Sequence, residues 1–194
     1  GFGQQTYVPD NNFEAYLEGA GMGNGILNDD SVTTANIVGQ GQLDISSQGI
    51  SDLTGIEDFT ALWNFECYEN QITSLYLLNP NLTFLDCSDN QLTSLDVSHN
   101  TGLYNCYCFS NQLTSLDLRN GNNINFYDIN ATNNPNLTCI SVDYPFWSTT
   151  NWTVSGNYID PQMYFSADCS VSGIEEYTTN KELLKVTDIL GRET

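Results

Sequence analysis

Apolar residues recur along the middle of this chain with a period of 20 or 21 residues. One copy of the pattern runs from Leu82 through Cys87 and Asn90 to Val97, and similar copies begin 20 residues earlier and 21 residues later. A unit of this length cannot bury its apolar face alone, so neighbouring copies stack into a continuous solenoid. The pattern therefore predicts a solenoid in which each copy forms one coil.

The first half of each coil ends in alternating apolar and polar residues, which is typical of a short β-strand. Leu85 and Cys87 are expected to point into the core. Phe84, Asp86 and Ser88 are expected to point outward. Strands of successive coils then pair as a parallel sheet, ~4.8 Å apart. Because the second half of each coil has the same spacing, the opposite wall is expected to hold strands rather than helices.

An asparagine follows the first strand of each coil, at Asn70, Asn90 and Asn111, with Thr132 in its place in the fifth coil. An inward amide at this bend can satisfy backbone groups that the bend leaves unpaired. We interpret these asparagines as structural.

The N-terminal residues 1–41 depart from the repeat. Phe13, Tyr16 and Leu17 have helical spacing, and Asp10 precedes them as the expected N-cap. We expect this helix to cover the open end of the core, because stacked repeats need terminal units that differ from the rest.

The repeat also weakens toward the C-terminus. A fifth coil runs from Ile124 through Tyr127 and Ile129, and residues 137–142 form a last, degenerate coil.

These residues closely resemble short bacterial leucine-rich repeats, whose consensus is LxxLxLxxNxLxxLDLxxN. The positions that match it in one copy are Leu82, Leu85, Cys87, Asn90, Leu92, Leu95, Asp96, Val97 and Asn100. The resemblance covers about residues 43–142. It implies a strongly β-rich member of the α/β leucine-rich-repeat class, with about five to six coils, and a role in binding and adhesion.

The segments after residue 136 resemble parts of secreted proteins from marine Bacteroidetes. Residues 136–169 look like their C-terminal cap, and residues 180–193 are similar to the start of the sorting domain that directs type IX secretion. The resemblance implies an extracellular or cell-surface location, and the start of the chain lacks a signal peptide, as a processed N-terminus would. The expected division is an N-terminal cap at 1–41, a solenoid at 42–142, a C-terminal cap at 143–170 and a tail at 171–194.

The six cysteines fall into two groups. Four occupy inward or leucine positions and are expected to be buried free thiols that act as small apolar side chains: Cys67, Cys87, Cys106 and Cys108. Cys139 in the last coil and Cys169 in the cap are expected to form a disulfide, which fastens the cap and removes roughly 3–4 kcal/mol of chain entropy from the unfolded state.

The chain has 24 acidic and 4 basic residues, and only Arg119 among the basic ones precedes residue 180. Such a charge repels nucleic acid and anionic membrane surfaces, so neither is an expected partner. The longest apolar runs are far shorter than the ~20 residues of a membrane span.

Aromatic and acidic residues gather at the outward positions of the first wall. A soluble monomer rarely displays so many aromatic residues on one face, so a protein or glycan ligand is the economical explanation. The alternative is that the aromatics pair across strands and shield the backbone. The candidate ligand-binding residues are Trp63, Glu66, Tyr68, Phe84, Asp86, Tyr104, Tyr107, Phe109, Phe126 and Asp128.

Carboxylates are expected to align on the same wall. Asp44, Glu66 and Asp86 share one outward column, and Asp128 is expected to return to it after Tyr107. Adjacent carboxylates repel, and a hard cation relieves the repulsion. Ca²⁺ bound by Glu66 and Asp86 is therefore one hypothesis, with a second calcium position near residues 28–30; a solvated acidic face is the alternative.

Paired carboxylates are also what a retaining glycosidase uses. The chain has one histidine, His99, and no nucleophile motif or phosphate-binding glycine loop. We expect a protein that is not an enzyme and needs no cofactor.

Two further expectations concern modification and assembly. Asp30-Ser31-Val32 resembles the O-glycosylation signal of Bacteroidetes, which makes Ser31 a candidate site. An open-ended solenoid with a tail can also stack head to tail, so a self-assembling filament or surface-layer subunit is the alternative function.

Overall fold

The computed structural model describes residues 3–170. The strands are β1 (Gln5–Tyr7), β2 (Ser31–Thr33), β3 (Gln42–Asp44), β4 (Asn64–Glu66), β5 (Phe84–Asp86), β6 (Ser94–Asp96), β7 (Asn105–Tyr107), β8 (Ser115–Asp117), β9 (Asp128–Asn130), β10 (Cys139–Ser141) and β11 (Tyr164–Ser166). The α-helices are α1 (Asn11–Gly19), α2 (Thr34–Ile37) and α3 (Pro145–Asn151), and single 3-10 turns lie at Ile56–Asp58, Asn123–Asn125 and Val154–Gly156.

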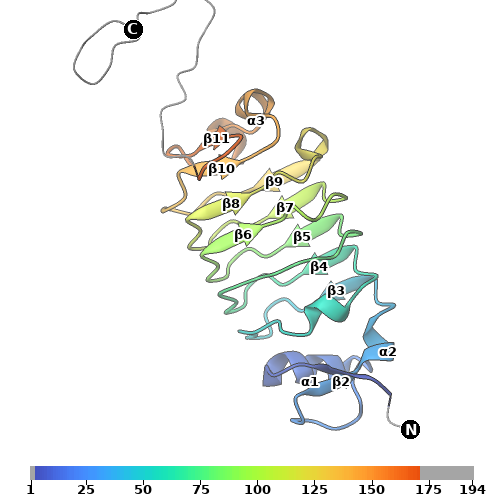
Figure 1. Cartoon of the computed structure of the whole chain (residues 1–194). Coiled ribbons are helices and arrows are strands. Elements are labelled where there is room, and N and C mark those ends of the chain that lie inside the picture. The colour runs from blue at the N-terminus through green and yellow to red at the C-terminus, as the bar shows by residue number, and fades with distance from the viewer. Residues whose placement is uncertain (1–2, 171–194) are drawn as a thin grey trace, which may run out of the picture.

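Two parallel sheets form the opposite walls of one solenoid (Figure 1). The front sheet has the strand order β3-β4-β5-β7-β9, and the back sheet has the order β11-β10-β8-β6. The expectation of strands rather than helices on the second wall is confirmed by β6 and β8. Residues 73–78 of the second coil, which have the same sequence pattern as β6, do not form a strand.

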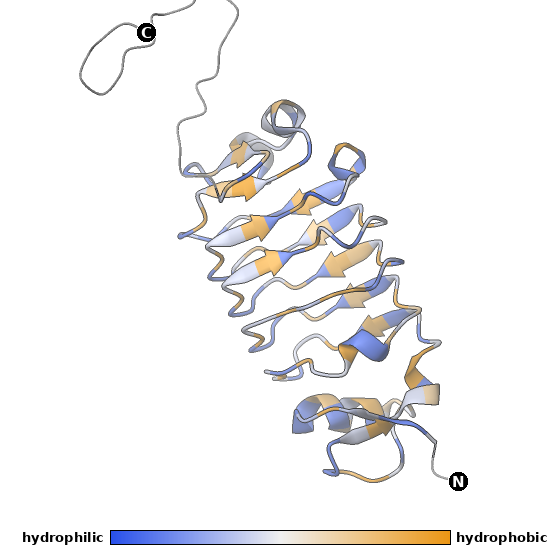
Figure 2. Cartoon of the chain, viewed as in Figure 1, coloured by the Kyte–Doolittle hydropathy of each residue, from blue (hydrophilic) through white to orange (hydrophobic). Residues whose placement is uncertain are grey.

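The core lies between the two walls, and apolar residues recur along both of them (Figure 2). The central residues of the front strands pair in register and are at most 3% exposed: Leu43, Phe65, Leu85, Cys106 and Ile129. The expected inward row of Cys67, Cys87 and Cys108 is confirmed, because all three are fully buried, and Cys106 is also a buried free thiol.

Ser88 is a correction. It was expected to point outward, but it is only 1% exposed. Its hydroxyl donates to Asp86 Oδ1 at 2.5 Å, and the larger Tyr68 and Phe109 hold the equivalent positions in the coils on either side, which leaves the small serine side chain covered.

The asparagines at the bend after the front strands are structural, as expected. Asn90 Nδ2 donates to Cys67 O at 2.9 Å and to Ser88 O at 3.0 Å, while Asn90 Oδ1 accepts from Ile72 N at 3.0 Å. The fourth member of this row is Asn134, which accepts from Leu113 N, rather than Thr132 as expected. The row therefore crosses the whole solenoid.

A second row of asparagines lies at the opposite corner of the coils. Asn79 Nδ2 donates to Phe59 O at 2.7 Å, Asn100 Nδ2 to Asn79 O at 2.9 Å, and Asn120 Nδ2 to Asn100 O at 3.1 Å. Each amide thus links its coil to the preceding one.

Helix α1 covers the N-terminal end of the core, as expected. Asp10 is its N-cap, and Asp10 Oδ1 accepts from Asn12 N and Phe13 N, both at 3.0 Å. The other carboxylate oxygen accepts from the backbone and hydroxyl of Ser51, both at 2.8 Å. One side chain therefore caps the helix and fastens it to the first coil.

The buried face of α1 closes the first coil. Phe13 and Leu17 are fully buried, and the Phe13 ring stacks on Phe59 with 6.4 Å between the centroids. Burial raises the pKa of Asp10, but the hydrogen bonds from Ser51, Phe13 and Asp52 outweigh it, so the net pKa lies below the usual value.

The C-terminal end is closed by an aromatic cluster. Trp152 follows α3, is 4% exposed, and lies 5.5–5.7 Å from the rings of Phe126, Trp147 and Phe165. Phe126, expected on the surface, is therefore a core residue that is 7% exposed. The reason is that the register of β9 places Phe126 at the inward position that Leu103 holds in the preceding coil, where it packs against Trp152.

The predicted disulfide between Cys139 and Cys169 is confirmed and ties β10 to the segment after β11. Residues 171–194, with their resemblance to a sorting domain, lie outside the described residues. Among residues 3–170, every helix is too short or too polar to cross a membrane.

Candidate binding surface

The outward residues of the front sheet form two columns, which we call the front surface. One column runs Gln42, Asn64, Phe84, Asn105 and Asp128, and the other runs Asp44, Glu66, Asp86, Tyr107 and Asn130. Candidate residues from four consecutive strands are thus brought onto one face.

Asp128 does not lie in the carboxylate column, which corrects its expected position. Asn130 follows Tyr107 in that column, and Asp128 follows Asn105 in the other. The coil between Tyr107 and Asn130 contains the extra 3-10 turn Asn123–Asn125, which shifts the register of β9. The span from Tyr107 to Asn130 is two residues longer than the span from Asp86 to Tyr107, and a shift of two residues keeps a side chain on the same face but moves it to the other column.

The carboxylates of the front surface also stabilise the turns after the strands. Asp86 Oδ1 accepts from Ser88 N at 3.0 Å, and Asp44 Oδ1 accepts from Ser46 N at 3.0 Å and from its hydroxyl at 2.6 Å. Burial raises the pKa of Asp86, and the hydrogen bonds from Ser88 offset this only in part. Asp86 is therefore a half-buried acceptor within a turn.

Aromatic residues of the two columns contact each other. The rings of Phe84 and Tyr107 lie 5.6 Å apart at 60°, and the Tyr107 hydroxyl donates to Asp128 Oδ2 at 2.9 Å. Burial and this hydrogen bond raise the pKa of Tyr107. Pairing across strands, which the sequence offered as an alternative to ligand binding, is thus observed for this pair.

Three exposed aromatic residues lie in a row directly before the front strands β4, β7 and β9, and we call this row the aromatic margin. It consists of Trp63, Tyr104 and Tyr127, which are 43%, 43% and 85% exposed. Thr83 lies between the first two: Thr83 N donates to Trp63 O, Tyr104 N to Thr83 O, and Tyr127 N to Tyr104 O. The three residues therefore form one row across the N-terminal ends of the front strands.

The Trp63 ring lies against the backbone of the first coil. A Cβ atom at Gly41 would come within 2.6 Å of Trp63 Nε1, so the glycine leaves the space that this ring occupies. Tyr127 was absent from the expected surface residues; the same register shift that buries Phe126 exposes it.

Tyr68 and Phe109 lie just beyond the C-terminal ends of the front strands β4 and β7. Both are half-buried, and the buried Ser88 occupies the equivalent position in the coil between them. Their faces are less available than those of the aromatic margin.

The expected calcium positions differ in their surroundings. Glu66 and Asp86 lie directly opposite each other on β4 and β5. Asp29 accepts hydrogen bonds from Asn24 Nδ2 at 3.0 Å and from the Ser31 hydroxyl at 3.1 Å. Among residues 3–170 no group of three or more His, Cys, Asp or Glu side chains is arranged to hold a metal ion. Calcium binding stays a prediction.

Comparison with known proteins gives structural neighbours only. No protein-family model and no curated protein matches the chain. The functional domain of InlJ from Listeria monocytogenes, which includes a cysteine ladder, is 26% identical, with a TM-score of 0.55. That match covers 73% of this chain and 39% of the InlJ chain, so this chain corresponds to about two fifths of its neighbour.

Two further structures from the same species are internalins. InlF is 22% identical over 70% of this chain and 44% of its own, with a TM-score of 0.49. Internalin C2 is 18% identical over 88% of this chain and 94% of its own, with a TM-score of 0.36. Together, the InlJ likeness and the stacked parallel strands define the fold as a β-rich leucine-rich-repeat solenoid with a disulfide-closed cap.

Proposed function

We propose that this chain is a non-catalytic recognition module, secreted or displayed at a cell surface, that binds a protein partner through the front surface and the aromatic margin. The observation that carries the proposal is the aromatic margin itself. Trp63, Tyr104 and Tyr127 expose their rings at the N-terminal ends of the front strands. Tryptophan and tyrosine are the residue types that contribute most binding free energy at protein interfaces.

The charge of the surface favours a particular kind of protein. Glu66, Asp86 and Asp128 lie on the front surface, and the whole chain has a net charge of −20. A basic partner would be attracted at long range, so its association rate would fall as salt is added. We therefore propose a partner with a basic contact surface.

The extracellular location is supported by the disulfide between Cys139 and Cys169, because disulfides persist in oxidising compartments. The resemblance of residues 136–193 to Bacteroidetes cap and sorting sequences supports export by type IX secretion. The cysteine ladder of the InlJ domain is a further parallel to the buried row of Cys67, Cys87 and Cys108.

A non-catalytic role agrees with the use made of the paired carboxylates. Asp86, which would act with Glu66 in a glycosidase, holds the turn after β5 through Ser88. A group with this structural duty is a poor choice for a nucleophile or a proton donor.

A glycan is the second candidate ligand, and the aromatic margin favours it too. Sugar rings stack on exposed aromatic faces, and the margin offers such faces at multiples of the coil spacing, ~4.8 Å. A glycan ligand predicts a loss of binding on removal of the rings but little dependence on salt.

Self-assembly into a filament has weaker support. Head-to-tail stacking would join the two ends of the core, but α1 covers one end and the cluster around Trp152 covers the other. Two further proposals are calcium at Glu66 and Asp86, which calorimetry can test, and a glycan on Ser31, which mass spectrometry can test.

The experiment compares two variants of the chain in capture of partners and on a glycan array. Trp63→Ala combined with Tyr104→Ala removes two rings of the aromatic margin. Tyr164→Ala combined with Tyr144→Ala removes two exposed rings near the C-terminal cap and is the matched control. We expect the first variant to lose at least tenfold in affinity and the control to bind like the parent chain. Equal binding by both would refute the proposal, and a loss confined to the array would replace the protein ligand with a glycan.

A further inference from the structure

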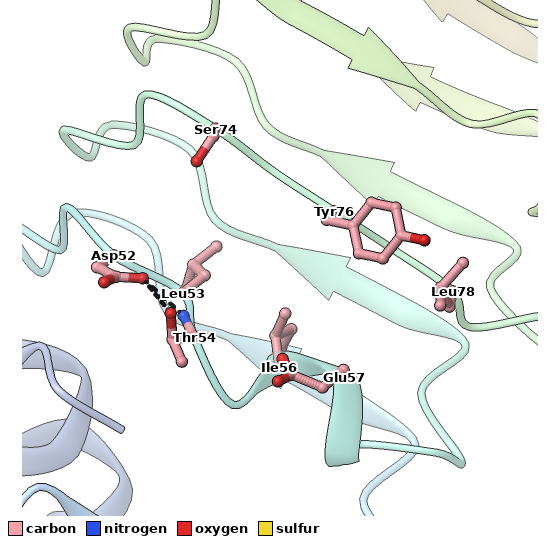
Figure 3. Close-up of a pocket in the computed structure, with 8 residues that line it drawn as sticks. All are labelled: Asp52, Leu53, Thr54, Ile56, Glu57, Ser74, Tyr76 and Leu78. Atoms are coloured by element: carbon pink, nitrogen blue, oxygen red, sulfur yellow. Dashed lines mark hydrogen bonds between the residues drawn. The ribbon is translucent and has the colours of Figure 1, made fainter. Parts of the chain in front are cut away.

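A groove crosses the back wall between the first and second coils (Figure 3). Its volume is about 310 Å³. Leu53 and Ile56 of the first coil form the apolar floor, and Tyr76 and Leu78 of the second coil form one side. The groove lies on the wall opposite the front surface, so it is a separate site.

The groove lies where neither the first nor the second coil contributes a strand to the back sheet. In the first coil, residues 52–54 correspond to β6 but form no strand, and the 3-10 turn Ile56–Asp58 follows them. Residues 73–78 of the second coil have the apolar spacing of β6 and β8, but they do not form a strand or pair with β6.

The backbone of residues 73–78 is extended and unpaired. It makes no backbone hydrogen bond to any other coil within residues 3–170, although Gln71 N, just before it, donates to Ile50 O at 2.8 Å. An extended segment with free N–H and C=O groups is a template for an added strand.

The side chains of the groove suit a segment with apolar residues on one face. Tyr76 and Leu78 are 70% and 47% exposed, so two large apolar groups stand beside the opening. Leu53 and Ile56 are 5% and 3% exposed and offer only their edges to the floor. Because alternate residues of a strand face the same way, every second side chain of an added strand would meet this apolar surface.

The charge of the groove selects a cationic occupant. Asp52 and Glu57 line it, and each has one carboxylate oxygen free of hydrogen bonds within the described chain, because Thr54 binds one oxygen of Asp52 and Gly55 binds one of Glu57. Residues 1–118 contain no lysine or arginine that could neutralise them.

The geometry points to a docking site for an extended peptide segment of a partner protein, in which lysine or arginine alternates with apolar residues. The segment adds as a strand beside residues 74–78, sets its apolar side chains against Tyr76 and Leu78, and places its cations near Asp52 and Glu57. Backbone hydrogen bonds to residues 74–78 orient the segment, and the two carboxylates favour a basic sequence.

The test uses a labelled peptide of alternating valine and lysine, with binding followed by fluorescence anisotropy. We expect Asp52→Asn combined with Glu57→Gln to weaken binding about fivefold, the sum of two exposed ion pairs. Glu69→Gln combined with Asp89→Asn changes the net charge equally at the bends after the front strands, away from the groove, and should weaken binding less than about twofold. Equal weakening by both pairs would mean general attraction to an acidic protein and would overturn the proposal.

Two further measurements test the added strand. N-methylation of the valines in one peptide and of the lysines in another removes the N–H donors of one side of the strand at a time, because alternate N–H groups point the same way, so one of the two peptides should bind at least tenfold more weakly. Amide hydrogen exchange of residues 73–78 should slow when the valine–lysine peptide is bound. Tight binding of both N-methylated peptides, or unchanged exchange in this segment, would overturn strand addition.

Discussion

The asparagine row behind the front sheet makes a prediction that the structure quantifies. Asn90→Ala removes the Oδ1 atom that accepts from Ile72 N, and Ile72 N has no other acceptor among the described residues. The carbonyls that Asn90 contacts fare better, because Cys67 O keeps Asn70 Nδ2 and Ser88 O keeps Glu69 N. The substitution therefore leaves one buried N–H group without a partner.

An unpaired buried N–H costs ~1–3 kcal/mol, and the other lost hydrogen bonds add about 1 kcal/mol, so Asn90→Ala should lower the free energy of unfolding by roughly 2–4 kcal/mol. Asn79→Ala at the opposite corner provides the comparison. Within residues 3–170, Asn79 Oδ1 has no hydrogen-bond partner, and the acceptor of its amide, Phe59 O, also accepts from Leu62 N. Asn79→Ala orphans no donor and should cost only ~1 kcal/mol.

Urea unfolding monitored by tryptophan fluorescence measures both values on one scale. The exposed Gln91→Ala should lie within about 0.5 kcal/mol of the parent chain and serves as the control. If Asn90→Ala and Asn79→Ala cost the same, the reasoning from the orphaned Ile72 N–H is refuted.

Three other predictions concern the caps and the core. Replacing both Cys139 and Cys169 with serine should lower the free energy of unfolding by about 3 kcal/mol, measured by urea unfolding, because the closed loop spans 30 residues; an unchanged midpoint would contradict a role for this bond. Asp10 has a folded-state pKa below its usual value of 3.8, so the stability it contributes is present above pH 3.8 and is lost as the pH falls through the folded-state pKa; a melting-temperature series should show a smaller acid-induced drop for Asp10→Asn, and parallel curves would count against the cap. The four free cysteines are buried, and burial raises the pKa of Cys67 well above its usual value, so a thiol reagent should label none of them in the native chain and all four after unfolding; labelling before unfolding would show that the thiol row is accessible.

The central coils could be predicted from the sequence because their period is regular. Leu85 and Cys87 fall in the core, and Asn90 binds the backbone, since a spacing of 20 or 21 residues repeats side-chain direction from coil to coil. The disulfide could be predicted from its position at the end of the repeat.

The fifth coil could not be predicted because its length differs. The turn at Asn123–Asn125 buries Phe126 and exposes Tyr127, and Asn134 takes the place expected for Thr132. A coil that is two residues longer than its neighbours cannot be recognised from their period, but it changes which of its own residues reach the surface.

The groove on the back wall was also missed. Residues 73–78 have the same apolar spacing as β6 and β8, yet they form no strand. Whether a segment pairs depends on its neighbours in space, which the local sequence does not record.

The claim that the aromatic margin forms the recognition surface is tested most directly by site-specific photo-crosslinking. A photoreactive phenylalanine derivative at Tyr127, on the margin, is compared with the same group at Tyr164, on β11 of the back sheet. The proposed function predicts that the partner crosslinks from position 127 and not from position 164. Crosslinking from position 164 alone would contradict it.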